Sequence, residues 1–127
     1  MAFKPDSYNS VSVYIVADGA QRVVDFLQQT FETAALRRFD APDGRISHAE
    51  IRVGDTVVMI ADAMGGYPAF PVWLHVYVPD VDAAYKKALA AGGSSVQEPI
   101  RREGDPDRRG GVKDPCGNTW WISTQVE

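Results

Sequence analysis

A strand-to-helix pattern occurs twice in the chain. Residues 13–20 read VYIVADGA and residues 74–82 read LHVYVPDVD. In both stretches, alternating apolar residues end at an Asp of a type that caps a following helix. A repeat spaced by about 60 residues corresponds to a whole supersecondary module. The sequence therefore predicts one module that has been duplicated, with a cleft between the two facing copies.

The first module, residues 8–63, is predicted to contain one strand, one helix and three further strands. Asp18 is expected to cap the helix, whose apolar residues recur at the i, i+3, i+4, i+7 spacing of an amphipathic helix. The turn signals are Pro42-Asp43-Gly44 and Gly54-Asp55. The four strands are expected over residues 11–17, 34–39, 46–53 and 56–60.

A glycine- and proline-containing linker, residues 64–70, is predicted to lead into the second module, residues 71–127. This module repeats the same order, and its residues 101–109 are expected to form a polar loop. Its helix should span residues 80–91, and its strands residues 72–78, 95–100, 111–113 and 119–124. The prediction is a single α+β domain, residues 1–127, in which two βαβββ modules form a cleft between curved sheets.

Charge and composition exclude several classes of function. The net charge of −4 argues against a general nucleic-acid binder, which needs a basic face. No apolar run is long enough to span a bilayer, and no signal peptide is visible. A single cysteine, Cys116, allows no disulfide within the chain and fits a reducing, cytoplasmic setting. Arginines near position 105 alternate with acidic residues, as in a solvated loop or, alternatively, an anion clamp.

Three stretches of the chain resemble the vicinal oxygen chelate superfamily, which includes glyoxalase and bleomycin-resistance proteins. They are residues 16–20, residues 48–55 and residues 107–120, and they are most similar to the PhnB-like branch. The resemblance covers nearly the whole chain and implies the paired βαβββ fold. It also implies a homodimer, because a partner chain often completes the clefts in this superfamily. The fold alone does not select a function, since it hosts lyases, dioxygenases, epimerases and drug-binding proteins.

The metal site that this resemblance implies is not supported by the residues at its positions. Counting from the predicted capping residues and from Asp114-Pro115 carries the family's metal ligands onto Val11, Trp73 and Trp121. None of these side chains supplies the imidazole, carboxylate or thiolate that Zn²⁺ or Fe²⁺ requires. We therefore expect no metal and no cofactor at this position.

A relocated metal site is an alternative. His48 and Glu50 share one face of a predicted strand, and His75 lies two residues beyond Trp73 on another. Two histidines and a carboxylate are sufficient for a metal triad. Otherwise His75 is expected to be a buried, hydrogen-bonded histidine.

Strand alternation predicts an aromatic cleft in place of the metal. If Trp73 faces the cleft, His75 and Tyr77 face it too. If Trp121 faces the cleft, Thr119 and Ser123 face it as well. Trp120 then packs in the core. Aromatic faces favour flat guests, with about 0.5–1.5 kcal/mol per stacking contact beyond the area buried. The full set of expected ligand-binding residues is Trp73, His75, Tyr77, Trp121, Thr119, Ser123, Tyr67, Phe70, His48 and Glu50.

The leading functional hypothesis is a non-catalytic protein that sequesters a planar aromatic compound. An antibiotic or a quinoxaline-like chromophore is the expected kind of ligand, with a role in resistance or transport. A metal-dependent lyase or dioxygenase that uses His48, Glu50 and His75 is the main alternative. A scaffold without a ligand is the third, with Trp73 and Trp121 simply filling the cleft or forming a dimer contact.

Overall fold

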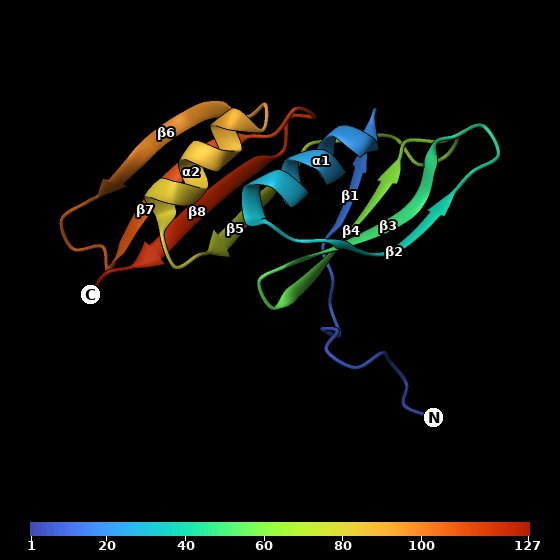
Figure 1. The fold of residues 1–127 in the computed structure, drawn as a ribbon, viewed down its shortest axis with the longest axis horizontal. Coiled ribbons are helices and arrows are strands. Elements are labelled where there is room, and N and C mark those ends of the chain that lie inside the picture. The colour runs from blue at the N-terminus through green and yellow to red at the C-terminus, as the bar shows by residue number, and fades with distance from the viewer.

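The computed structural model describes residues 1–127 as two four-stranded sheets, each covered on one face by one helix (Figure 1). The first module contains β1 (Tyr14–Ala17), α1 (Ala20–Phe31), β2 (Ala35–Asp40), β3 (Ile46–Val53) and β4 (Thr56–Asp62). The second contains β5 (Trp73–Tyr77), α2 (Val81–Ala90), β6 (Ser94–Arg101), β7 (Asp107–Lys113) and β8 (Thr119–Gln125). The predicted α+β fold of two βαβββ modules is confirmed.

The two sheets have the same topology. Their strand orders are β1-β4-β3-β2 and β5-β8-β7-β6. In each sheet the first strand pairs in parallel with the last, and the remaining neighbours are antiparallel. The repeat recognised in the sequence thus extends to the order and direction of every strand.

The core lies between each sheet and its helix, and it is continuous across the two modules. Phe26 of α1 and Trp120 of β8 are both fully buried and lie in aromatic contact. The two helices lie side by side on the same side of both sheets (Figure 1). Each sheet therefore has a second face, turned away from its helix, which we call its open face. No helix in the structure has the length and apolarity needed to cross a membrane.

The predicted N-terminal cap of α1 is wrong. Gly19, in the left-handed conformation at φ 83°, precedes the helix, and no side chain of its own caps it. The Asp62 carboxylate at the end of β4 accepts instead from the backbone N–H groups of Gly19 and Ala20, at 3.1 and 2.8 Å. The expected cap of α2 is present, since Asp80 accepts from the N–H of Ala83 at 3.1 Å.

The position of the caps changes the correspondence between the modules. α1 begins two residues after Asp18, whereas α2 begins one residue after Asp80. A count that treats these two aspartates as equivalent is therefore wrong by one residue. Ser12, rather than Val11, therefore occupies the position in the first module that Trp73 occupies in the second.

We expect Asp62→Ala to destabilise the protein and Asp18→Ala to leave its stability nearly unchanged. Asp62 also accepts from the N–H of Ile46 at 2.7 Å, so its removal deprives three backbone donors of their partner. The loss in the free energy of unfolding should be about 2 kcal/mol, against less than about 0.5 kcal/mol for Asp18→Ala. Urea denaturation of both variants measures the difference. A larger loss in Asp18→Ala would contradict the assignment of the cap.

The predicted polar loop at residues 101–109 is also shorter than expected. β6 continues to Arg101 and β7 already begins at Asp107. The charged side chains in β7 are accommodated because alternate residues reach polar partners on both faces. Arg108 forms two hydrogen bonds to Asp82 at the start of α2, both at 2.9 Å, and Arg109 points to the open face. Strand β1 is shorter than predicted and begins at Tyr14 rather than at residue 11.

Candidate functional site: two open sheet faces

The open face of the second sheet brings together six of the residues singled out from the sequence. Neighbouring strands β5 and β8 align Trp73 with Thr119, His75 with Trp121, and Tyr77 with Ser123. Paired residues on adjacent strands point to the same face. Strand alternation alone had predicted each of these two groups of three, and the pairing of β5 with β8 joins them.

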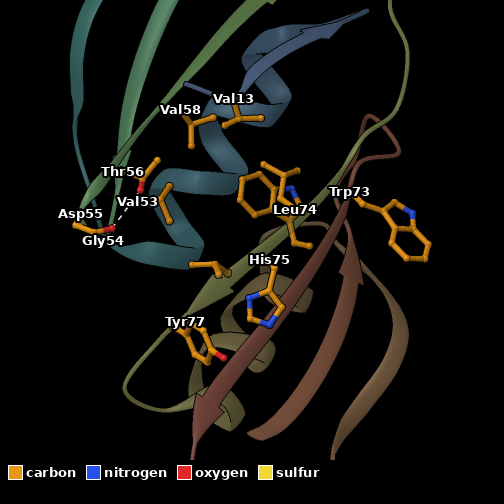
Figure 2. A pocket seen from close by; sticks show the side chains of 12 residues that line it. Val13, Val53, Gly54, Asp55, Thr56, Val58, Trp73, Leu74, His75 and Tyr77 are labelled. Carbon is orange, nitrogen blue, oxygen red and sulfur yellow. Dashed lines mark hydrogen bonds between the residues drawn. The ribbon is translucent and has the colours of Figure 1, made fainter. Parts of the chain in front are cut away.

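Trp73 and Trp121 form an edge-to-face pair on this open face. Their ring centroids lie 5.4 Å apart at an interplanar angle of 67°. Trp73 is 75% exposed and projects from the start of β5 (Figure 2). Because the rings are in contact, a flat guest cannot lie between them. The surface available for stacking is the free face of Trp73.

Trp121 is held over the backbone of the neighbouring strand. It pairs with Gly111 of β7, and a Cβ atom at residue 111 would lie only 2.6 Å from Cζ3 of the indole. Glycine therefore provides the space in which the ring lies. The Nε1 atom of Trp121 is buried and has no hydrogen-bond partner.

A polar chain runs beside the aromatic pair. The Oγ of Ser123 lies 3.0 Å from Nε2 of His75, and Nε of Arg109 donates to the same nitrogen at 3.4 Å. Arg109 also pairs with Asp107, which accepts from the hydroxyl of Tyr77 at 2.6 Å. Partial removal of the ring from water, together with the positive charge of Arg109, lowers the pKa of His75. The lone pair of Nε2 is therefore already engaged by donors within the protein.

Several expectations for this face need revision. His75 is exposed rather than buried, although it is hydrogen-bonded as expected. Thr119 and Ser123 lie on this face but are buried, so Ser123 acts by supporting His75. The contributions of Asp107 and Arg109 were missed because their segment was interpreted as a loop. Alternation within residues 107–113 is the signal that would have found them.

The open face of the first sheet carries a second polar group around Glu50. Its carboxylate is 3% exposed, and it accepts from the hydroxyl of Tyr8 and lies 2.8 Å from Nε2 of His48. The other ring nitrogen of His48, Nδ1, lies 2.9 Å from the hydroxyl of Tyr14. Arg37 is 3.9 Å from the carboxylate. His48 and Glu50 thus lie together, as expected, but Tyr8 and Tyr14 complete their surroundings.

Glu50 is ionised in this group. Burial alone would raise the pKa of Glu50, but the hydrogen bonds from Tyr8 and His48 and the nearby Arg37 outweigh it and leave the pKa below its ordinary value. An ionised carboxylate only accepts hydrogen bonds, so Nε2 of His48 must carry a proton.

The two linker residues of the predicted set lie in different places. Tyr67 lines a cavity of about 550 Å³ beside the first sheet, together with Tyr14, Val16 and Ala61. Phe70 lines a smaller cavity of about 260 Å³ next to Cys116. Neither cavity includes Trp73 or Trp121 among its lining residues.

A pocket of about 580 Å³ lies where the two modules meet. Trp73, His75 and Tyr77 belong to it on the β5 side (Figure 2). Val13, Val58 and the β3–β4 turn form the opposite wall. Its volume falls within the range of small-molecule sites, about 300–1,000 Å³. Leu74 and Val76, which pack against the core, line this pocket too. Strand β5 therefore lies along the border between this pocket and the open face of the second sheet.

The residues do not fit the divalent metal that the fold suggests. The positions inherited from the family are occupied by Trp73 and Trp121, and by Ser12 once the register is corrected. None of them is a side chain that Zn²⁺ or Fe²⁺ prefers. The relocated triad is not assembled either. His48 and Glu50 lie on the first sheet and His75 on the second, and no three His, Cys, Asp or Glu side chains gather as metal ligands would.

The two βαβββ modules share one strand order, and each leaves one face of its sheet open. Residues 9–122 match the family model described as Glyoxalase/Bleomycin resistance protein/Dioxygenase superfamily. The chain belongs to this superfamily.

The relatives show how widely the fold is shared. The chain is 32% identical over 131 residues to Rv0887c, an uncharacterized protein of Mycobacterium tuberculosis, covering 92% of this chain and 75% of that protein. TioX from Micromonospora sp. ML1 is a solved structure with 26% identity and a TM-score of 0.75, over 92% of this chain and 98% of TioX.

A glyoxalase I mutant from Zea mays gives a TM-score of 0.74 at 19% identity, over 91% of this chain and 46% of that chain. At that identity the likeness extends to the fold alone.

Proposed function

We propose that the chain is a non-catalytic binding protein that sequesters a planar aromatic small molecule, such as an antibiotic, in a resistance or carrier role. The observation that carries this proposal is the exposed indole of Trp73, in contact with Trp121, at positions where metal ligands would otherwise lie. A large exposed aromatic surface on a concave or pocketed face is typical of a recognition site. A cytoplasmic location belongs to the same proposal, because the lone Cys116 suits a reducing compartment.

Stacking on one indole face does not supply enough free energy for micromolar binding. Each 100 Å² of apolar surface removed from water contributes about 2.5 kcal/mol, whereas micromolar binding requires about 8 kcal/mol. Small-molecule sites also bury about 70–90% of their ligands. A ligand stacked on Trp73 therefore needs a second wall, either from the pocket between the modules or from another chain.

We infer that a second copy of the chain supplies this wall in a homodimer. Both open faces expose large apolar side chains, Phe39 on the first sheet and Trp73 and Tyr77 on the second. Pairing one open face with another would cover these side chains and enclose a ligand. Sedimentation velocity at micromolar concentration should give twice the chain mass of 13.9 kDa. A monomer under those conditions would remove the dimer from the proposal.

Tryptophan fluorescence tests the binding site directly. We expect planar antibiotics from a broad panel to quench the emission in a saturable manner. Trp73→Ala should weaken the affinity by at least about tenfold, because it removes both the stacking contact and the apolar area beneath the ligand. Trp121→Ala should weaken binding less, since its ring supports Trp73 from the side.

A control variant separates loss of the site from loss of the fold. Leu89 is a partly exposed apolar residue of α2, on the helix side of the sheet, so Leu89→Ala should bind as the wild type does. Flat titrations with every planar compound, or equal affinity in Trp73→Ala, would overturn the proposal.

A further inference from the structure

A continuous chain of polar groups crosses the open face of the first sheet. Tyr14 on β1, His48 on β3 and Glu50 on β3 are joined by contacts of 2.9 and 2.8 Å. Tyr14 reaches across β4 to make this contact, since it pairs with Met59, whereas Glu50 pairs with the same Met59 from the other side. The order hydroxyl, imidazole, buried carboxylate is the arrangement in which a base is oriented by a third group.

The direction of the hydrogen bonds follows from the carboxylate. Nε2 of His48 donates to ionised Glu50, so in the neutral ring Nδ1 has a free lone pair. The hydroxyl of Tyr14 must then donate to Nδ1. Its proton is committed to His48, and the oxygen presents its lone pairs to any other partner. The oxygen of Tyr14 can thus accept a hydrogen bond from a ligand, while Nδ1 of His48 can take up the proton of Tyr14.

Tyr14 also belongs to a cavity. Its side chain lines the space of about 550 Å³ described above, together with Tyr67 and Met64. Val16 and Ala61 line it as well, together with Ser47 and Asp62. The Asp62 carboxylate is occupied by the backbone N–H groups from which it accepts. Phe39 lies beside His48 at 6.5 Å between ring centroids and is largely exposed. The chain of polar groups therefore ends among aromatic and apolar surfaces that suit a ring-shaped ligand.

We propose that the first module holds its own ligand site, in which Tyr14, His48 and Glu50 bind a planar compound with an acidic hydroxyl group, a phenol or enol, and take up its proton. The hydroxyl of the ligand donates to the oxygen of Tyr14. When the ligand proton moves to Tyr14, the proton of Tyr14 moves to Nδ1 of His48. The products are the ligand oxyanion, neutral Tyr14, and an imidazolium ion paired with the carboxylate of Glu50.

The electrostatics favour this relay over ionisation of the tyrosine. Burial, followed by the negative charge of Glu50, raises the pKa of Tyr14, so a free tyrosinate is disfavoured. In the relay Tyr14 gives and receives a proton together and never carries the charge. The positive charge forms on His48, next to a carboxylate that is already ionised and held by Tyr8.

The site is independent of the aromatic pair on the second sheet and can be observed separately. All three tryptophans, Trp73, Trp120 and Trp121, lie in the second module. Their fluorescence reports on that module, whereas the ionisation of a chromogenic phenol reports on its own proton. Failure of one site therefore leaves the test of the other unaffected.

The test is an absorbance titration with 4-nitrophenol, buffered at a pH at which the free phenol is mostly protonated. Addition of wild-type protein should produce the yellow phenolate band in a saturable manner. Tyr14→Phe keeps the ring and removes the accepting oxygen, so the phenolate band should be lost. Glu50→Gln keeps the size of the side chain and removes the charge that stabilises the imidazolium, so the band should be lost there as well.

Controls distinguish a lost relay from a lost fold. Glu98→Gln is the matched change at an exposed glutamate of β6 and should leave the band at its wild-type intensity. Tyr14→Phe alters only a partly exposed hydroxyl, and its thermal unfolding should show that it is folded. The proposal is overturned if wild-type protein produces no phenolate band, or if folded Tyr14→Phe still produces it.

Discussion

Asp114→Ala is expected to lower the free energy of unfolding by roughly 4 kcal/mol, the largest effect of any single polar substitution in the chain. Asp114 lies in the turn between β7 and β8 and is 4% exposed. It accepts from the backbone N–H groups of Cys116 and Asn118, at 2.9 and 3.1 Å, and from Nδ2 of Asn118 and Nε1 of Trp120, both at 3.0 Å. Alanine would leave these donors without an acceptor.

The size of the effect follows from burial. A buried donor that loses its partner costs about 1–3 kcal/mol, because water cannot replace the missing acceptor. The indole of Trp120 is part of the continuous core between the modules, so its displacement would also disturb the packing against Phe31 of α1.

Urea denaturation of Asp114→Ala and of Asp55→Ala provides the comparison. Asp55 occupies the corresponding β3–β4 turn of the first module, where it is exposed and accepts only from the hydroxyl of Thr56. Its replacement should cost less than about 0.5 kcal/mol. Similar losses in the two variants would show that the buried hydrogen bonds of Asp114 contribute little.

Gly111→Ala is expected to displace Trp121 and to weaken binding of a planar ligand by up to about tenfold, equivalent to at most about 1.4 kcal/mol, as Trp121→Ala should. The added Cβ would lie 2.6 Å from Cζ3 and 2.9 Å from Cε3 of the indole, closer than real side-chain contacts allow. The ring must move, and its edge-to-face contact with Trp73 is lost. Overpacking of this kind also costs about 1–3 kcal/mol of stability.

Two measurements follow the displacement. The emission spectrum of the unliganded variant should shift, because the buried Nε1 of Trp121 becomes hydrated, and the fluorescence titration should give the weaker affinity. Gly65→Ala is the matched control, because a Cβ at that linker position meets no atom within 4 Å. An unchanged spectrum and affinity in Gly111→Ala would mean that the strand, rather than the ring, accommodates the methyl group.

Most of the fold could be predicted from local patterns. Apolar patterns and turn signals indicated a strand at each of the eight places, although β7 was expected only over residues 111–113, and the repeat gave their order. The errors occurred where a polar sequence forms regular structure. Arg108 and Arg109 belong to a charged segment that resembles a loop. They nevertheless pair with both β6 and β8, and their side chains find partners on opposite faces of the sheet.

The candidate site was predicted only in part, for a related reason. Alternation places Trp73, His75 and Tyr77 on one face whatever the rest of the fold, because side chains two apart on a strand point the same way. It does not measure the angle between two rings, and so the edge-to-face contact of Trp73 with Trp121 came only from the structure. Tyr14 was missed because its partner His48 lies two strands away.

Local sequence patterns are sufficient to specify the duplicated modules, the order of their elements, and the face on which each strand residue lies. These properties follow from periodicity and turn chemistry, which depend on residues close together in the chain. Tertiary packing instead selects the capping of α1 by Asp62, the set of hydrogen bonds that Asp114 accepts, and the chain of contacts from Tyr14 to Glu50. Each of these depends on the exact partners of polar groups. Several residues of the right type are available for each role, and only the packing of strands against one another selects the one within hydrogen-bonding distance.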